Sequence, residues 1–177
     1  MADKIPSEFP SIVVGGGCFW CTEAAYLMHR GVVTVVSGYT GGAVANPGYG
    51  AVCSGRTGHA EVVRVSYDPA LVSAGDLFDF FWKIHDPTTL NGQGADEGTQ
   101  YRSVIFYADE AERTAAMDSR ERARTKWGDA IVTTFEPLEE FYPAEDYHQN
   151  YFARNPEAGY CRAVIAPKIA RIETETD

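Results

Sequence analysis

One stretch near the N-terminus constrains the fold most strongly, because a short apolar strand leads through three glycines into a helix that begins with two cysteines. The β-branched run Ile12-Val13-Val14 predicts a buried strand. Gly15-Gly16-Gly17 ends that strand and allows a sharp turn. Residues 19–29 then have a helical composition, and Gly31 suits the C-terminal cap. This order places Cys18 at the N-terminus of a helix.

The rest of the chain alternates between strand and helix patterns. β-branched or alternating segments predict strands at 32–36, 60–67, 103–107, 130–135 and 164–165. Apolar and alanine-rich segments predict helices at 77–84, 109–127 and 144–153. Ser73 and Asp76 form a capping-box pattern before the first of these. The irregular alternation predicts an α/β (α+β) fold, with a mixed sheet and helices packed against it.

Length and charge limit the organisation and the partners. A chain of 177 residues fits one domain, so we expect a single catalytic domain over residues 1–177 with flexible tails at 1–11 and 170–177. Asp and Glu number 25 against 15 Lys and Arg, which gives a formal net charge of −10. Nucleic acids and anionic membranes need a basic surface, so we expect neither as a partner.

The cysteine count and the N-terminal residues indicate the cellular setting. Residues 1–11 contain charges and prolines but no apolar stretch of signal-peptide length. Four cysteines are too few for a secreted disulfide scaffold. We therefore expect a cytoplasmic monomer whose thiols stay reduced and take part in chemistry.

Cys18 is the candidate nucleophile. At a helix N-terminus, free N–H groups and the helix dipole favour an anion, so we expect a lowered pKa and a reactive thiolate. Three alternatives remain open. Cys18 could be a buried structural cysteine; Cys18 and Cys21 could form the Cys-x-x-Cys pair of a thioredoxin-like disulfide oxidoreductase; or both could bind zinc together with Cys53 and His59.

Glu61 is the candidate proton donor. Alternation over 60–67 puts Glu61 on the same strand face as Val63 and Val65, the face expected to meet the core. Burial there would raise the pKa of the carboxyl and keep it protonated. A strand-end glutamate that reaches solvent is the alternative.

Two glycine-rich loops carry the other candidates for binding groups. The loop over residues 38–58 contains Tyr49, and the loop over residues 91–103 contains Asp96 and Tyr101. Binding residues are often held on loops of this kind, although glycine and aspartate are also ordinary turn residues.

Several of these segments together resemble one family. Gly17-Cys18-Phe19-Trp20 resembles the active-site signature of the A-type peptide methionine sulfoxide reductases. The other matching segments are Ser37-Gly38-Tyr39, Val52-Cys53-Ser54-Gly55, Gly58-His59-Ala60-Glu61, His85-Asp86-Pro87-Thr88-Thr89, Gly98-Thr99-Gln100-Tyr101-Arg102-Ser103 and His148-Gln149. The resemblance covers residues 12–168.

The resemblance implies a fold, a reaction and a site. The fold would have a ferredoxin-like two-layer sandwich core with long functional loops. The enzyme would reduce the S epimer of methionine sulfoxide, free or in proteins, without a metal or organic cofactor, and thioredoxin or another dithiol would supply the electrons. The implied site residues have separate roles: Cys18 attacks sulfur, Glu61 protonates the oxygen, the polar residues Tyr49, Asp96 and Tyr101 hold that oxygen, and Phe19 and Trp20 receive the methyl group.

The resemblance leaves two candidates for the resolving cysteine. Cys161, in Gly159-Tyr160-Cys161, matches the position of a C-terminal resolving cysteine, and position slightly favours it. However, residues 162–167 have a strand-like pattern instead of the mobile glycine-rich tail of those relatives, which could keep Cys161 from reaching Cys18. Cys21 lies three residues after Cys18, close enough on a helix for a modest distortion to join them. Cys53 is expected to be a bystander.

Overall fold

The structure is a computed structural model that describes residues 9–176. Its main sheet has six strands in the order β7-β6-β1-β3-β2-β8, and a small sheet pairs β4 with β5. The strands are β1 Ser11–Gly16, β2 Val32–Thr40, β3 Ala60–Tyr67, β4 Gly92–Gln93, β5 Asp96–Glu97, β6 Ser103–Tyr107, β7 Thr134–Pro137 and β8 Tyr142–Pro143. The α-helices are α1 Phe19–Leu27, α2 Tyr49–Cys53, α3 Ala74–Ile84, α4 Glu110–Trp127, α5 Tyr151–Arg154 and α6 Ala166–Thr176.

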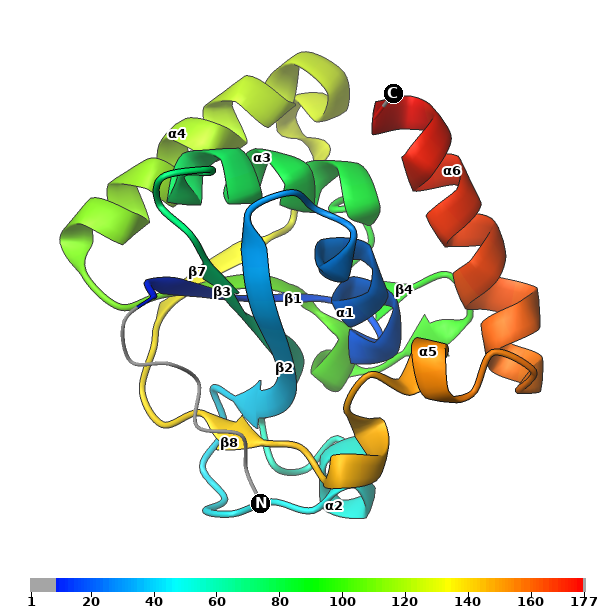
Figure 1. The fold of residues 1–177 in the computed structure, drawn as a ribbon. Coiled ribbons are helices and arrows are strands. Elements are labelled where there is room, and N and C mark those ends of the chain that lie inside the picture. Colours follow the sequence, from blue (N-terminus) through cyan, green and yellow to red (C-terminus); the bar gives the residue numbers. More distant parts are fainter. Residues whose placement is uncertain (1–8, 177) are drawn as a thin grey trace.

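The central four strands have the predicted ferredoxin-like arrangement. The chain runs β1-α1-β2-β3-α3-β6, and the strands lie in the order β6-β1-β3-β2 with antiparallel neighbours. Only β7 pairs in parallel within this sheet, next to β6. Figure 1 shows α1, α3 and α4 near the sheet and α6 at its side. The expectation of a mixed sheet with helices packed against it is confirmed.

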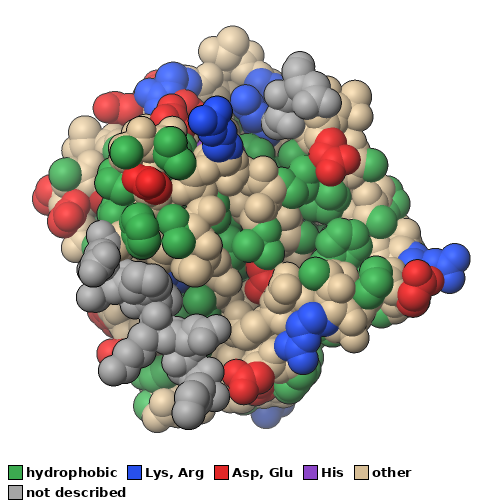
Figure 2. Space-filling view, viewed as in Figure 1, with side chains coloured by type: hydrophobic (Ala, Val, Ile, Leu, Met, Phe, Trp, Pro, Cys, Tyr) green, Lys and Arg blue, Asp and Glu red, His purple; other side chains and the backbone are tan. Residues whose placement is uncertain are grey.

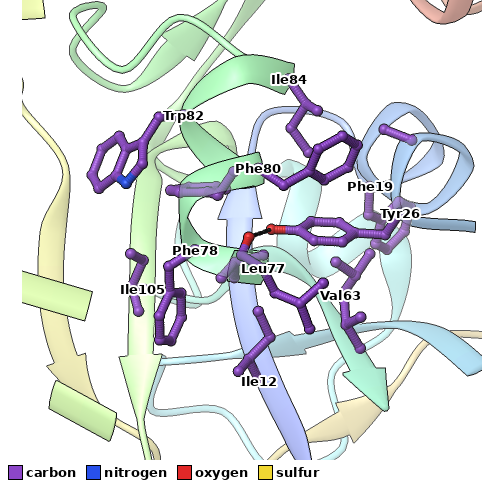
Figure 3. Close-up of a cluster of buried hydrophobic side chains, with 14 of the residues drawn as sticks. Ile12, Phe19, Tyr26, Val63, Leu77, Phe78, Phe80, Trp82, Ile84 and Ile105 are labelled. Carbon is purple, nitrogen blue, oxygen red and sulfur yellow. Dashed lines mark hydrogen bonds between the residues drawn. The ribbon is translucent and has the colours of Figure 1, made fainter. Parts of the chain in front are cut away.

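The core lies between the sheet and the helices α1 and α3. Ile12, Val63, Leu77, Phe78 and Phe81 belong to one cluster of side chains that are at most 1% exposed. Figure 3 shows side chains from both helices pointing toward the strands, and Tyr26 Oη donating a hydrogen bond of 2.9 Å to the carbonyl of Leu77. Apolar burial of this extent stabilises the fold and holds the start of α1 against β3.

The opposite face of the sheet has a smaller core. Val13, Val62, Val104 and Phe106 pack there against Phe141, which comes from the segment before β8. Both faces of β3 are therefore buried. A group that projects from either face near the middle of this strand is shielded from water.

Most predicted elements form, and local chemistry explains why. The capping box at Ser73 and Asp76 is present, with the Asp76 amide donating 3.1 Å to Ser73 Oγ. The strands at 12–14, 32–36, 60–67 and 103–107 and the helix at 109–127 lie where the sequence predicts them.

Three predictions in the second half of the chain are wrong. Residues 130–135 begin as the end of a 3₁₀ turn, and the strand starts only at Thr134. Residues 144–153 form a 3₁₀ turn and the single helical turn α5 instead of one helix. Residues 164–165 lie in the π-helical turn Cys161–Ile165 and not in a strand, because Ile165 is turned inward and fully buried.

The structure shows regular elements in the described parts of the two segments that were expected to be flexible tails. Residues 1–8 lie outside the described residues, but Ser11 already begins β1. Residues 170–176 continue α6, and Ile172 is 1% exposed within the main core cluster. This burial holds the end of the chain against the domain.

Candidate active site

The turn from β1 into α1 places Cys18 at the helix cap. Cys18 is the N-cap of α1 with extended backbone angles, and its carbonyl accepts hydrogen bonds from the amides of Cys21 and Thr22. Gly17 has a φ of +97°, and a Cβ there would lie 2.7 Å from Cγ of Gln93. Glycine is therefore required at this position for both conformation and space.

Cys18 and Cys21 form an interacting pair of thiols. Interaction with the Cys21 thiol, burial and the Glu61 carboxyl raise the pKa of Cys18 well above its ordinary value. The same interaction lowers the pKa of Cys21 to about 7. The expectation of a lowered pKa at Cys18 is wrong, because removal from water and the second thiol outweigh the helix N-terminus.

Glu61 lies buried beside the start of α1. The residue is 1% exposed, and its Oε1 accepts a hydrogen bond of 3.2 Å from the amide of Phe19. Its Oε2 is buried without a hydrogen-bond partner within the described residues. Burial raises the pKa of Glu61 to about 8, with a smaller contribution from the charge of Asp96. The carboxyl is therefore mostly protonated at neutral pH and has one oxygen free to act on a ligand.

The aromatic residues after Cys18 build a wall beside the thiol. Trp20 stacks on Tyr151 with ring centroids 3.8 Å apart and planes 8° apart. Its Nε1 donates a hydrogen bond of 3.1 Å to Nδ1 of His148. Phe19 is 1% exposed and packs against His148 at 5.1 Å between centroids. Trp20 is half-buried, so part of its ring is accessible, whereas Phe19 is buried next to it.

The two loop tyrosines lie close to Glu61. Tyr49 opens α2, where its amide donates 3.0 Å to Glu145 Oε2, and its ring lies 4.4 Å from that of His148. Burial, with smaller contributions from the charges of Glu61 and its neighbours, raises the pKa of Tyr49 and of Tyr101 above the ordinary value. Both phenols therefore remain protonated donors at neutral pH.

Asp96 lies in the cavity beside the thiol pair. Its Oδ2 accepts a hydrogen bond of 2.9 Å from Tyr160 Oη. Asp96 also lines a cavity of about 460 Å³ together with Cys18 and Cys21. The negative charge of Asp96 raises the pKa of both Glu61 and Tyr101. The site therefore gathers groups from both ends of the chain.

The structure places the remaining cysteines differently. Cys161 is fully buried in the π-helical turn and packs in one cluster with Cys21, Ala24 and Ile165. Cys53 is half-buried and accepts a hydrogen bond from the hydroxyl of Tyr49. His59 instead contacts backbone groups of the 38–58 loop.

Neither a metal cluster nor a membrane span is found in the described part of the chain. Across residues 9–176, no three His, Cys, Asp or Glu side chains come together as a group that could hold a metal ion. In the same range, no helix is both long enough and apolar enough to span a bilayer.

On the face shown in Figure 2, charged side chains of both signs lie mainly around the rim and hydrophobic side chains occupy more of the middle.

Sequence reasoning missed several residues of the site. Tyr151, Tyr160, Glu145 and Lys168 all contact or face the predicted residues, yet they lie far away in the chain. None belongs to a motif with its own chemistry, so only their place in the folded chain identifies them.

A ferredoxin-like core with a pair of thiols at a helix start, beside a protonated carboxyl, defines a thiol-dependent oxidoreductase.

Comparisons with known proteins specify the class. The family model "Peptide methionine sulfoxide reductase" matches residues 10–177. The chain belongs to this family. Curated relatives named peptide methionine sulfoxide reductase MsrA are 53% identical over 161 residues in Paenarthrobacter aurescens (91% of this chain, 92% of the relative) and 53% identical over 162 residues in Deinococcus radiodurans (90% and 79%).

Solved structures agree in fold. Mxr1 from Saccharomyces cerevisiae in reduced form has a TM-score of 0.83 and 40% identity, over 88% of this chain and 91% of that one. Methionine sulfoxide reductase A of Corynebacterium diphtheriae has a TM-score of 0.79 and 38% identity, over 84% and 76%. A structure of Mxr1 in complex with Trx2 has a TM-score of 0.60 and 32% identity, over 82% and 86%.

Proposed function

We propose that this chain reduces the S epimer of methionine sulfoxide, free or in proteins, with Cys18 as nucleophile and Glu61 as proton donor. The observation that carries these roles is the buried, protonated carboxyl of Glu61, whose unpaired Oε2 lies beside the helix that begins at Cys18. A sulfoxide oxygen leaves badly unless it is protonated. The reaction therefore needs a nucleophile that attacks sulfur and an acid that protonates the oxygen. The Cys18 thiol and the neutral Glu61 carboxyl would supply these two groups.

The first step transfers oxygen between two sulfur atoms. Cys18 attacks the sulfoxide sulfur as its thiol proton passes to Cys21, whose thiol interacts with that of Cys18. Glu61 protonates the sulfoxide oxygen and then recovers a proton from the thiol pair. The sulfur–oxygen bond of the substrate breaks and Cys18 becomes a sulfenic acid. Methionine sulfur is reduced by two electrons, and Cys18 is oxidised by two.

The substrate is held by two kinds of contact. Tyr49, Tyr101 and Asp96 surround Glu61 and would hold the oxygen and a water molecule through hydrogen bonds. The ring of Trp20, supported by Phe19, would receive the methyl group, because its stack on Tyr151 fixes its plane. Apolar contact on one side and hydrogen bonding on the other distinguish the two sulfoxide epimers.

Cys21 is the better supported resolving cysteine. Its sulfur already interacts with Cys18, and this interaction lowers the pKa of the Cys21 thiol, which favours the nucleophilic thiolate. Cys161 packs in the same cluster as Cys21, and its own side chain has no exposed surface. We therefore propose a first disulfide between Cys18 and Cys21, which thioredoxin reduces.

A single-turnover assay tests the function. The reduced enzyme is mixed with excess methionine S-sulfoxide or R-sulfoxide without a reductant, and methionine is counted. We expect about one methionine per chain from the S epimer and none from the R epimer, and continuous turnover after thioredoxin is added. An enzyme that reduces insulin disulfides but forms no methionine would instead be the thioredoxin-like oxidoreductase.

A further inference from the structure

The C-terminal helical segment presents one side to the thiol pair. Tyr160, Val164, Lys168 and Arg171 follow one another at intervals of three or four residues and all line the cavity of about 460 Å³ that contains Cys18 and Cys21. The adjacent side of the segment carries Cys161, Ile165 and Ile172, which are buried. This burial fixes the rotation of the segment, so the side chains that face the cavity are determined by the core.

Lys168 brings a positive charge into this cavity. Its side chain is half-buried, whereas Arg171, the other cation of the lining, is exposed. Among the charged groups near Lys168, Cys21 does most to raise the pKa of the lysine, ahead of Cys18 and Asp96. Burial disfavours an ammonium group, so a lysine held here needs an anionic partner. The sulfur of Cys21 lines the same cavity as Lys168 and can become an anion during the reaction.

We propose that Lys168 is a positioning residue for the second half of the cycle, in which its ammonium group holds Cys21 as the thiolate that attacks the Cys18 sulfenic acid. This inference rests on the proposed role of Cys21. The Cys21 thiolate forms the sulfur–sulfur bond, and the sulfur–oxygen bond of the sulfenic acid breaks. The leaving hydroxide takes up the proton that Cys21 had lost, so the step releases water. Cys21 is oxidised and Cys18 is reduced to the disulfide level.

The other groups around Cys21 do not replace this charge. Tyr160 Oη lies 3.8 Å from the sulfur, but its hydroxyl proton is donated to Asp96 Oδ2 at 2.9 Å, so Tyr160 does not supply a charge to Cys21. Asp96 opposes a thiolate by its negative charge. Cys161 packs against Cys21 without contributing a charge. Glu61 faces the pair from β3 and is protonated at neutral pH. Lys168 is the cation whose charge lowers the pKa of Cys21.

The test follows the pH dependence of two reactions of Cys21. The first is alkylation of Cys21 by iodoacetamide in the reduced enzyme, mapped by peptide mass spectrometry. The second is the decay of the Cys18 sulfenic acid after one turnover, followed by trapping with dimedone. The variants are Lys168→Met, Lys168→Gln and the conservative Lys168→Arg. Lys83→Met, on the exposed side of α3, is the matched control.

The expected result is a shift of the pH profile. For Lys168→Met and Lys168→Gln, the midpoint of Cys21 alkylation should rise by about one pH unit. A thiolate of higher pKa is scarcer but more nucleophilic, so sulfenic acid decay should be about threefold slower at pH 6 and about twofold faster at pH 9. Lys168→Arg should restore the wild-type profile, and Lys83→Met should not change it.

The outcomes separate the two levels of the proposal. The role of Lys168 would be overturned if the pH profile of Cys21 alkylation were unchanged in Lys168→Met and Lys168→Gln. It would also be overturned if decay of the Cys18 sulfenic acid slowed equally at every pH. Either result would leave the role of Cys21 intact. If Cys21→Ser forms the Cys18 disulfide as fast as the wild type, the resolving role of Cys21 fails instead. The alkylation midpoint would then still show whether Lys168 acts on the Cys21 thiol.

Discussion

The amide of Phe19 donates a hydrogen bond of 3.2 Å to Oε1 of Glu61 and so ties the first turn of α1 to β3. This bond engages one carboxyl oxygen and leaves Oε2 buried and without a hydrogen-bond partner among the described residues. A helix amide usually favours the charged carboxylate, but burial outweighs it and the pKa of Glu61 rises to about 8. The proposed proton donor and the proposed nucleophile are therefore positioned by the same helix start.

Replacing Glu61 tests its role as proton donor. Glu61→Gln keeps the size of the side chain and removes the proton, so formation of methionine in one turnover should slow by roughly 10²- to 10⁴-fold. In the wild type, this rate should fall as pH rises through about 8. Stopped-flow measurement of one turnover checks both points. Glu112→Gln is the control, since Glu112 is a half-buried carboxyl of α4. A near-normal rate in Glu61→Gln would remove this role.

The same carboxyl makes folding stability depend on pH. The pKa of Glu61 is about 8 in the folded chain against an ordinary value of 4.5, so the folded state holds the proton more tightly. Its contribution is fully present below about pH 4.5 and is lost as pH rises through 8. Relative to Glu61→Gln, the wild type should therefore lose a few kcal/mol of unfolding free energy over this interval. Urea titrations at several pH values measure the difference, with the exposed Glu110→Gln as control. A constant difference from pH 4 to 9 would contradict the assignment.

The stack of Trp20 on Tyr151 should affect substrate binding. The stack fixes the indole plane, and aromatic pairs contribute roughly 0.5–1.5 kcal/mol beyond burial. Tyr151→Leu should therefore raise KM about 2- to 10-fold with little change in kcat, whereas Tyr151→Phe should resemble the wild type. Steady-state kinetics with methionine S-sulfoxide measures both. An equal loss in both variants would show that the hydroxyl matters and not the stack.

Mapping disulfides after one turnover identifies the resolving cysteine. Cys161→Ser should still form a disulfide between Cys18 and Cys21, because these two sulfurs already interact. Cys21→Ser should accumulate the Cys18 sulfenic acid, which dimedone traps. Peptide mass spectrometry distinguishes the products, and Cys53→Ser serves as the control. A Cys18–Cys161 disulfide as the first product in the wild type would reverse the assignment.

The sequence by itself determined the parts of this protein that depend on local chemistry. Alternation in residues 60–67 predicted β3 and the inward side of Glu61, since successive side chains of a strand point to opposite faces. Glycines followed by Cys18 predicted the turn into α1. The Ser73–Asp76 capping box predicted the start of α3. These signals act over a few residues and survive any tertiary arrangement.

Only the tertiary structure decided the features that depend on burial and on distant partners. Val164-Ile165 fits a strand or a helix equally well, and contact of Ile165 with Cys21 and Ala24 selects the helix. Burial and the second thiol reverse the expected direction of the Cys18 pKa. Lys168 comes to face Cys21 because α6 buries Ile172 in the core. The physical reason is that removal from water and long-range charge act through space, while a sequence pattern reports only neighbours along the chain.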